Sequence, residues 1–140
     1  MVYLDTSAAV PLFVPEPASE RVAAWFAHCG DAVVSGDWIV TEFSSALALK
    51  ERRGEIATAD ADAVRSEFEM FCAIGLRLVP VSRSAFASAA RLVRDAANGL
   101  RSGDSLHLAI ALEIGASSIA TADVTLAENA CKQGLAAVRF

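Results

Sequence analysis

The chain has 140 residues, of which 54% are hydrophobic and 21% are charged. A chain of this length and composition can bury a sizeable core and suits one globular domain. Its formal charge of −5, from 12 basic and 17 acidic residues, excludes a protein that captures nucleic acid through overall attraction, so any such contact has to be local.

The three cysteines, Cys29, Cys72 and Cys131, are an odd number and lie far apart. They form no C-x-x-C pair and have no nearby pair of histidines, so neither a disulfide framework nor a zinc site is indicated, and we expect a reduced, cytoplasmic setting. The amino terminus lacks the basic and apolar regions of a signal peptide, and no apolar run is long enough to span a bilayer. We therefore expect a soluble protein that does not bind membranes.

Short β-type runs alternate with segments of helical periodicity, and glycines that can take positive φ follow most of the helical segments. The expected strands are Val2–Leu4, Ala32–Val34, Leu76–Val81, Ser118–Thr121 and Ala136–Phe140. The expected helices are Ser7–Val14, Ala18–His28, Trp38–Arg53, Thr58–Ile74, Arg83–Ala97, Asp104–Ile114 and Val124–Gln133. Strands separated by helices cannot pair through tight hairpins, so the predicted fold class is α/β, a three-layer α/β/α sandwich with a parallel sheet, with residues 1–140 forming a single domain.

Two acids closely follow expected strands. Asp5 comes directly after Val2–Leu4 in "VYLDTSA", and Asp123 follows the strand "SIAT". Each acid taken alone is better interpreted as the N-cap of the next helix. Because the carboxyl ends of parallel strands meet at one edge, where such sheets bind ligands, the two acids together favour a site.

Glu42 lies in the helical segment "DWIVTEFSSALALK". Stepping about 100° per residue from Ile39 places the apolar arc between roughly −80° and +80°, with Glu42 near −60°. A carboxylate inside an apolar stripe loses hydration unless a cation or hydrogen-bond donors compensate. A functional role is therefore favoured over the alternative, a side chain that reaches solvent at the margin of the stripe.

Asp104 stands in "LRSGDSLHLAIALEIG", where Gly103 breaks the chain and an apolar helix begins. By itself this is a helix-start signal, with Asp104 as a cap or a partner of the helix dipole. His107, one turn further on, could be a core or packing histidine or could touch a substrate. Because it has no evident partner, we favour the packing role and assign it no catalytic one.

Four well-separated acids, without a P-loop, a nucleophile elbow or a glycine-rich dinucleotide turn, indicate an all-oxygen site for a hard divalent cation. Mg²⁺ and Mn²⁺ prefer carboxylates and water to nitrogen or sulfur. Such a cation neutralises carboxylates that otherwise repel one another, and it can activate water and stabilise charge on a phosphoryl group. The pattern therefore predicts phosphodiester hydrolysis.

The order of four segments, "VYLDTSA", "TEFSSAL", "GDSLHLAIA" and "IATADVTLA", resembles that of PIN-domain ribonucleases, specifically the VapC-type toxins of bacterial toxin–antitoxin pairs. The resemblance covers nearly the whole chain, and although each segment is short, their combined order and spacing are specific. It implies a PIN-like fold and a metal-dependent endoribonuclease that hydrolyses RNA phosphodiester bonds.

Carried onto this sequence, the resemblance implies that four acids hold Mg²⁺ or Mn²⁺ and position the attacking water: Asp5, Glu42, Asp104 and Asp123. Ser7 and Thr121 match hydroxyl positions that support these acids through hydrogen bonds. The implied mechanism is in-line attack by metal-activated water without a covalent intermediate. An Asp5→Asn change is expected to abolish activity, keep the fold and relieve repulsion in the metal-free protein.

Two positions depart from the pattern of the family. Val124 and Thr125 stand where many relatives carry further charges, which puts an auxiliary acid on that side in doubt. Asp37, which follows the expected strand Ala32–Val34, would lie at the same edge and could compensate. Its simplest role is to cap the helix that carries Glu42.

The resemblance also implies a homodimer, an RNA substrate and a cognate antitoxin whose tail covers the acidic groove. A basic antitoxin segment would suit an acidic cleft in an acidic protein. Arginines form two groups, in which only members on the rim of the cleft would count as phosphate contacts: Arg52 and Arg53, then Arg91, Arg94 and Arg101.

Two competing interpretations remain. A phosphatase of the haloacid dehalogenase type also begins with an acid after its first strand, but it needs a second Asp two residues later, where this chain has Ser7, and a later lysine, for which only Lys50 and Lys132 exist. A degenerate PIN domain that binds RNA or protein without cutting is the non-enzymatic alternative. The presence of all four acids weighs against it.

Overall fold

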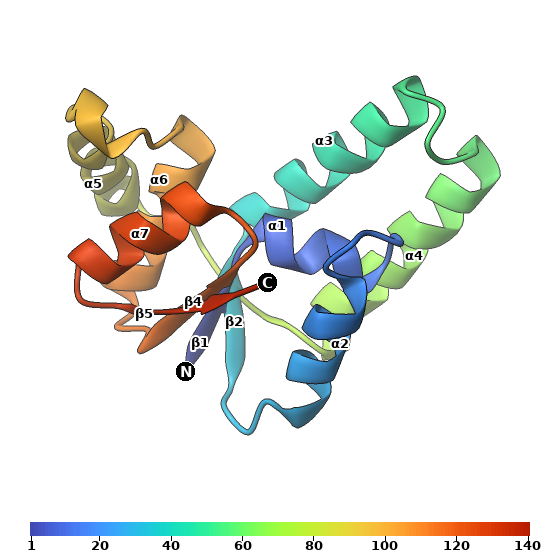
Figure 1. Ribbon diagram of the computed structural model, residues 1–140, viewed down its shortest axis with the longest axis horizontal. Coiled ribbons are helices and arrows are strands. Elements are labelled where there is room, and N and C mark those ends of the chain that lie inside the picture. The colour runs from blue at the N-terminus through green and yellow to red at the C-terminus, as the bar shows by residue number, and fades with distance from the viewer.

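A computed structural model describes residues 1–140 and shows a five-stranded sheet flanked by helices (Figure 1). The strands are β1 (Val2–Leu4), β2 (Val33–Gly36), β3 (Arg77–Val79), β4 (Ser118–Thr121) and β5 (Ala136–Arg139). All pairs are parallel, in the order β3-β2-β1-β4-β5. In the register of the central strand, Tyr3 lies opposite Val34 on one side and Ile119 on the other.

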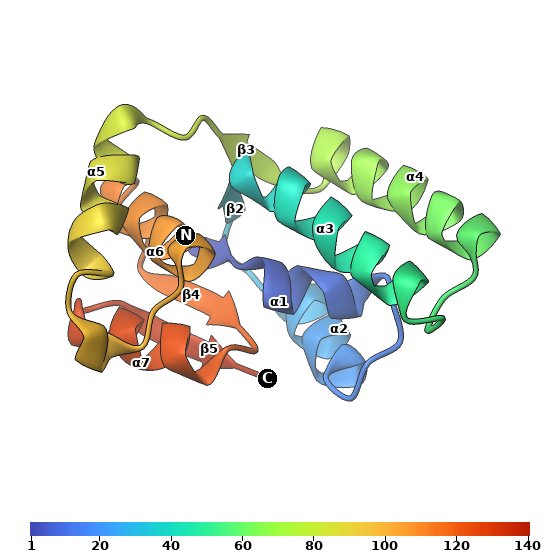
Figure 2. The same cartoon turned by 90° about the horizontal axis from the view of Figure 1, so that it is seen from above.

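The helices fill the connections between the strands. The α-helices are α1 (Thr6–Ala9), α2 (Ser19–His28), α3 (Trp38–Arg52), α4 (Thr58–Ile74), α5 (Arg83–Leu92), α6 (Ser102–Glu113) and α7 (Val124–Lys132), and the 3-10 turns are η1 (Val10–Leu12) and η2 (Ala96–Asn98). Figure 2 shows α1 to α4 on one side of the sheet and α5 to α7 on the other. None of these helices combines the length and the hydropathy needed to cross a membrane.

Alternation along the strands produces two apolar faces. Val2 and Leu4 of β1 belong to the core cluster that contains residues of α1, α3 and α4, whereas Tyr3 belongs to the cluster that contains residues of α5, α6 and α7. In β4, Ile119 joins the cluster of Tyr3 and Ala120 joins the other. Successive side chains of a strand point to opposite faces, so a sheet covered on both faces requires continuous apolar runs. The expected three-layer α/β/α sandwich is confirmed.

Helices α3 and α4 form a paired arm that extends away from the sheet (Figure 2). Phe43 of α3 and Phe68 of α4 stack with their ring centroids 3.7 Å apart and their planes at 2°. Phe13, just after η1, packs edge-on against both rings at 5.5 and 5.6 Å. These contacts hold α3 against the segment that follows β1, and they therefore position Glu42, which α3 carries.

Two helices are shorter than the sequence suggests. The expected helix Ser7–Val14 is divided into α1 and η1, because Pro11 lacks the N–H that an α-helix would use at that point. The expected helix Arg83–Ala97 ends at Leu92, and Asp95 then accepts the N–H of Ala97 to begin the separate turn η2.

Two other elements, one strand and one helix, have boundaries that differ from the expected ones. Strand β2 continues to Gly36, two residues beyond the expected Ala32–Val34. Helix α6 begins at Ser102, two residues before the expected start, so Asp104 lies within the first turn rather than at its boundary.

The central strand β1 is the point where strand order reverses, because the chain moves from β1 to β2 on one side and later returns to β4 on the other. Ligands of parallel sheets bind at the carboxyl ends of the strands near such a point. Asp5 follows β1 there, and Asp123 follows β4.

Candidate metal centre and active site

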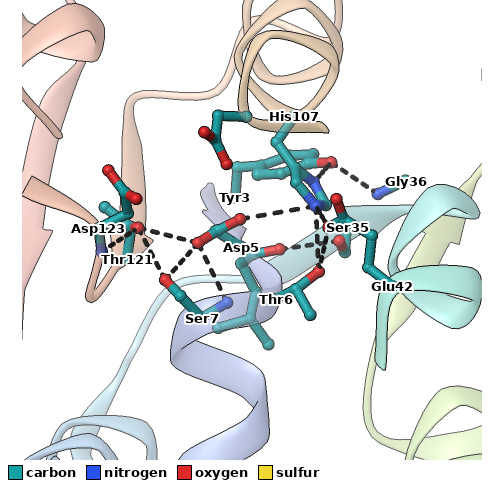
Figure 3. Close-up of polar contacts among 12 residues, drawn as sticks. Tyr3, Asp5, Thr6, Ser7, Ser35, Gly36, Glu42, His107, Thr121 and Asp123 are labelled. Carbon is teal, nitrogen blue, oxygen red and sulfur yellow. Dashed lines mark hydrogen bonds and ion pairs between the residues drawn. The ribbon is translucent and has the colours of Figure 1, made fainter. Parts of the chain in front are cut away.

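Asp5 leaves β1, caps α1 and is only 3% exposed. Its Oδ2 accepts three hydrogen bonds, from the N–H of Ser7 at 3.1 Å, from the hydroxyl of Ser7 at 2.5 Å and from the hydroxyl of Thr121 at 2.9 Å. Hydrogen bonds to an ionised carboxylate are the strong ones, and these three compensate for its burial. Its Oδ1 accepts none and lies 3.5 Å from Nε2 of His107 (Figure 3).

Asp123 lies on one side of Asp5 and caps α7 (Figure 3). Its Oδ1 accepts the N–H of Leu126 at 2.8 Å, and its own N–H donates to the hydroxyl of Thr121 at 2.9 Å. Thr121 therefore joins the two acids, since it donates to Asp5 and accepts from the backbone of Asp123. Both acids act as helix caps and both lie at the shared edge, so the two interpretations of the sequence hold together.

Glu42 reaches the same edge from α3, on the other side of Asp5 from Asp123 (Figure 3). Its Oε2 accepts hydrogen bonds from the hydroxyl of Thr6 at 2.7 Å and from Nε2 of His107 at 2.5 Å. Burial raises the pKa of Glu42, but these two bonds and the positive charge of His107 outweigh burial and lower the pKa below its ordinary value. Its Oε1 accepts no hydrogen bond.

Asp104 approaches the edge from the first turn of α6. Its Oδ2 accepts a single long hydrogen bond, 3.3 Å, from the N–H of Arg101. Burial raises the pKa of Asp104, and the negative charges of the neighbouring carboxylates raise it further, above all that of Asp123; the bond from Arg101 opposes them. Asp104 is therefore the acid at this edge whose charge is least well compensated.

His107 is fully buried and belongs to the site, which the sequence interpretation missed. Its Nε2 bonds to Glu42, which is 65 residues away in the chain, and its Nδ1 lies 2.7 Å from the hydroxyl of Tyr3. Burial lowers the pKa of His107, but the bond to Glu42 and the negative charges of Asp5 and Glu42 raise it above its ordinary value. One signal was available, because positions three apart on a helix share a face and Asp104 precedes His107 by three.

The four carboxylates share one pattern of hydrogen bonding: one oxygen of each accepts a bond from the protein, and the other oxygen accepts none. The engaged oxygens are Oδ2 of Asp5, Oε2 of Glu42, Oδ2 of Asp104 and Oδ1 of Asp123. Side-chain atoms of Asp5, Glu42 and His107 lie within 4.8 Å of one another, so these three side chains meet at one point of the edge. Carboxylates that are oriented through one oxygen and free at the other fit a hard divalent cation.

A groove of about 570 Å³ runs from this edge along α3. The four acids, Ser7 and Thr6 line it at one end, and two cationic side chains of α3 and the turn after it, Lys50 and Arg53, line it further along. Lys50 pairs with Glu16 at 2.7 Å and Glu55 at 3.3 Å, whereas Arg53 is largely exposed and makes only a longer ion pair, with Glu55 at 3.9 Å.

Most of the other charged candidates lie outside the groove. Of the five arginines considered from the sequence, only Arg53 lines it, and Arg91 lines a separate hollow instead. Asp37 occupies the N-cap position of α3, as expected, but its side chain makes no cap hydrogen bond, and it is exposed outside the groove.

Gly103 lies where the Glu42 carboxylate closely approaches the start of α6. A β-carbon at Gly103 would overlap Oε1 of Glu42 and would lie 3.6 Å from Nε1 of Trp38. Nε1 of Trp38 is the one buried side-chain nitrogen or oxygen without a hydrogen-bond partner. The sequence suggested only that Gly103 breaks the chain before a helix, whereas in the structure it leaves room for the Glu42 carboxylate.

Comparisons with known proteins identify the family of this chain. The model of the PIN domain family matches residues 2–131, a span that includes all four acids. The chain belongs to the PIN-domain family. Among curated members, ribonuclease VapC45 of Mycobacterium tuberculosis is 32% identical over 115 residues, which cover 82% of this chain and 77% of the relative.

Solved PIN-domain structures share the fold. VapC20 of Mycobacterium tuberculosis, described as a sarcin–ricin loop cleaving toxin, superposes with a TM-score of 0.76 at 18% identity and covers both chains completely. VapBC2 of Rickettsia felis, bound to a DNA fragment from their promoter, gives a TM-score of 0.68 at 14% identity and covers 99% of this chain and 98% of that one. The expected PIN-like fold and the resemblance to VapC-type proteins are therefore confirmed.

In this PIN domain without metal, Asp104→Asn is expected to raise the free energy of unfolding by about 0.5–2 kcal/mol at neutral pH, the range of an improved charge distribution. A raised pKa in the folded state means that the contribution of this carboxyl to stability falls as pH rises from the ordinary carboxyl pKa through the raised one. The gain should therefore disappear below the ordinary pKa. Urea unfolding in EDTA at neutral and acidic pH measures it.

Asp5→Asn is the matched control for this prediction. It makes the same change at a carboxylate that accepts three hydrogen bonds, so weaker bonds should lower the free energy of unfolding by about 1 kcal/mol. From the sequence alone, Asp5→Asn is expected to relieve repulsion among the carboxylates. From the structure, we expect this relief in Asp104→Asn instead. Equal effects of the two variants would contradict this division.

Gly103→Ala is expected to keep the fold and to weaken Mn²⁺ binding about 10-fold, because the new methyl group displaces the end of the Glu42 side chain. Calorimetric Mn²⁺ titration and the melting temperature measure the two effects. Gly30→Ala is the control, since a β-carbon there meets no atom within 4 Å. Unchanged Mn²⁺ affinity in Gly103→Ala would show that the position of Glu42 is not critical.

Proposed function

We propose that this chain is the toxin of a toxin–antitoxin pair and a metal-dependent endoribonuclease that hydrolyses RNA phosphodiester bonds at the acidic edge of its sheet. The observation that carries the proposal is that four carboxylates line one groove at this edge, and in each of them one oxygen accepts a hydrogen bond from the protein and the other accepts none. The named relatives are VapC ribonucleases, and the chain is a ribonuclease of this type. We assign metal binding and catalysis to Asp5, Glu42, Asp104 and Asp123.

Mg²⁺ or Mn²⁺ is the proposed cofactor, because the free ligand atoms are carboxylate oxygens. When bound, such an ion would lower the pKa of a coordinated water and stabilise negative charge on a phosphoryl group. The protein supplies orientation: Ser7 and Thr121 hold Asp5, the N–H of Leu126 holds Asp123, and Thr6 holds Glu42. We assign Ser7 and Thr121 this supporting role only.

The groove provides a path for the RNA strand. Lys50 lies eight positions after Glu42 on α3, a rise of about 12 Å, so the cations lie along the groove rather than at the acidic edge. Phosphate contacts position a strand without reading its bases. We assign backbone contact to Arg53, whose charge is the more available of the two, with Lys50 beside it.

A cognate antitoxin is the proposed protein partner. Its contact would be a basic segment in the groove, since like charges would repel an acidic one. We also propose a homodimer in the cytoplasm, built from one PIN-like domain over residues 1–140. A non-catalytic module that binds RNA or protein is the alternative, and the absence of metal-dependent cleavage would favour it.

Cleavage of total RNA by the purified chain tests the enzymatic proposal. Mg²⁺ or Mn²⁺ should support cutting, EDTA should abolish it, and Asp5→Asn should reduce the rate by at least about 100-fold, because the buried carboxylate is part of the metal site. Asp37→Asn is the isosteric control, since it neutralises an exposed acid outside the groove. Cutting by Asp5→Asn at the wild-type rate would overturn the site assignment.

Arg53→Gln should weaken binding of single-stranded RNA and leave kcat unchanged. One lost phosphate contact should reduce the dependence of log K on log salt by about 0.7. Arg52→Gln is the matched control, because the neighbouring arginine is exposed but does not line the groove. The same salt dependence in both variants would remove Arg53 from the RNA path.

A further inference from the structure

Glu42 differs from the other three acids in how the protein compensates its charge. Asp5 and Asp123 cap helices and Asp104 lies in the first turn of one, where free N–H groups and the helix dipole favour an anion. Glu42 lies in the second turn of α3, where backbone N–H groups are already used within the helix. Its donors must come from other elements.

His107 supplies one of these donors from the opposite layer of the sandwich. It lies on α6, which packs in the core cluster of Tyr3, whereas α3 packs in the cluster on the other face of the sheet. The 2.5 Å bond between Nε2 of His107 and Oε2 of Glu42 therefore crosses the carboxyl edge from one helical layer to the other (Figure 3).

The imidazole ring of His107 is also held at its other nitrogen, Nδ1. Its Nδ1 lies 2.7 Å from the hydroxyl of Tyr3, which accepts the N–H of Gly36 at 3.1 Å. The rings of Tyr3 and His107 meet edge-on with centroids 5.6 Å apart. A β-carbon at Gly36 would lie 2.7 Å from a methyl carbon of Ile110, so this corner is tightly packed. The contacts from Gly36 of β2 to Tyr3 of β1, and from Tyr3 to His107, therefore fix the orientation of the imidazole ring.

The proton on Nε2 follows from its surroundings. This nitrogen faces carboxylate oxygens of Glu42 and Asp5 and the hydroxyl of Thr6, at 2.5, 3.5 and 3.1 Å. With Thr6 donating to Glu42, only a proton on Nε2 satisfies the short contact between the ring and the carboxylate. The bond to Glu42 is therefore the same whether the ring is neutral or charged.

We propose that His107, oriented by Tyr3, is a positioning residue that fixes the Glu42 carboxylate so that only its Oε1 is free in the site. This inference rests on the proposed function, since it says how one proposed metal-binding carboxylate is oriented. It also excludes His107 as a ligand, although its Nε2 lies near Asp5 and Glu42, because that nitrogen is committed to the hydrogen bond. Groups that orient metal-binding side chains in this way are commonly worth about 10–100-fold in metal affinity or activity.

The test compares His107→Leu and His107→Gln with the wild-type chain by calorimetric Mn²⁺ titration and RNA cleavage. His107→Leu should weaken Mn²⁺ binding about 10-fold or more. His107→Gln can place an amide N–H near the position of Nε2 and should recover most of the affinity. Leu108→Ala, a buried neighbour outside the site, controls for loss of packing in α6: its melting temperature should fall without a change in Mn²⁺ affinity.

Pulsed electron spin resonance of the Mn²⁺-loaded wild type separates positioning from ligation. The proposal requires that no nitrogen coupling of a directly bound imidazole appears; such a coupling, absent in His107→Gln, would overturn it. Wild-type Mn²⁺ affinity in a folded His107→Leu would also overturn it, as would failure of His107→Gln to exceed His107→Leu. If the wild type neither binds Mn²⁺ nor cuts RNA, the proposed function itself fails, which is a separate result.

Discussion

Negative charge gathered at one edge of a parallel sheet is the constraint on which the rest of this structure depends. Carboxylates placed close together in a partly buried site repel one another and lose hydration, so each must be compensated where it stands. Helix starts near β1, β4 and in α6 provide N–H groups for Asp5, Asp123 and Asp104. Hydroxyl groups of Ser7 and Thr121 add the remaining donors around the most buried acid.

The four carboxylates differ in how well hydrogen bonds compensate their charge, and this difference bears on metal binding. Asp5 is almost fully satisfied on one oxygen, whereas Asp104 has one long bond and a raised pKa from burial and from the charge of Asp123. A site that still has uncompensated charge in the metal-free protein favours binding of a divalent cation. The folded protein thus stores repulsion that a metal ion would relieve.

Helix α3 connects this site to the groove beside it. The same helix carries Glu42 near its start and Lys50 near its end, and the stacked rings of Phe43 and Phe68 join it to α4. Because Glu42 and Lys50 lie on the same helix, the acidic edge and the cationic part of the groove have a separation that the helix rise sets. The packing of α3 against α4 therefore helps to fix the position of the acidic edge relative to the cationic part of the groove.

Local patterns in the sequence were sufficient for the fold and for much of the site. Alternating strands and helices indicated the parallel sheet, and the rule for its carboxyl edge brought together Asp5 and Asp123, while helical periodicity placed Glu42 inside an apolar stripe. Where a pattern had two local explanations, the structure decided between them. Asp37 occupies the N-cap position of α3 without a side-chain hydrogen bond, and the helix that contains Asp104 starts two residues earlier than its glycine suggested.

The sequence by itself therefore determined the elements, their order and three of the four acids' places relative to a strand or helix end, because periodicity and helix-start signals act over a few residues. Only the tertiary structure decided the partner of Glu42. His107 is 65 residues away and on the other face of the sheet, and its bond to Glu42 depends on the packing of two helical layers. Gly103 likewise faces Glu42 only after folding. Contacts of this kind have no period in the sequence, since they arise where separate elements meet in space.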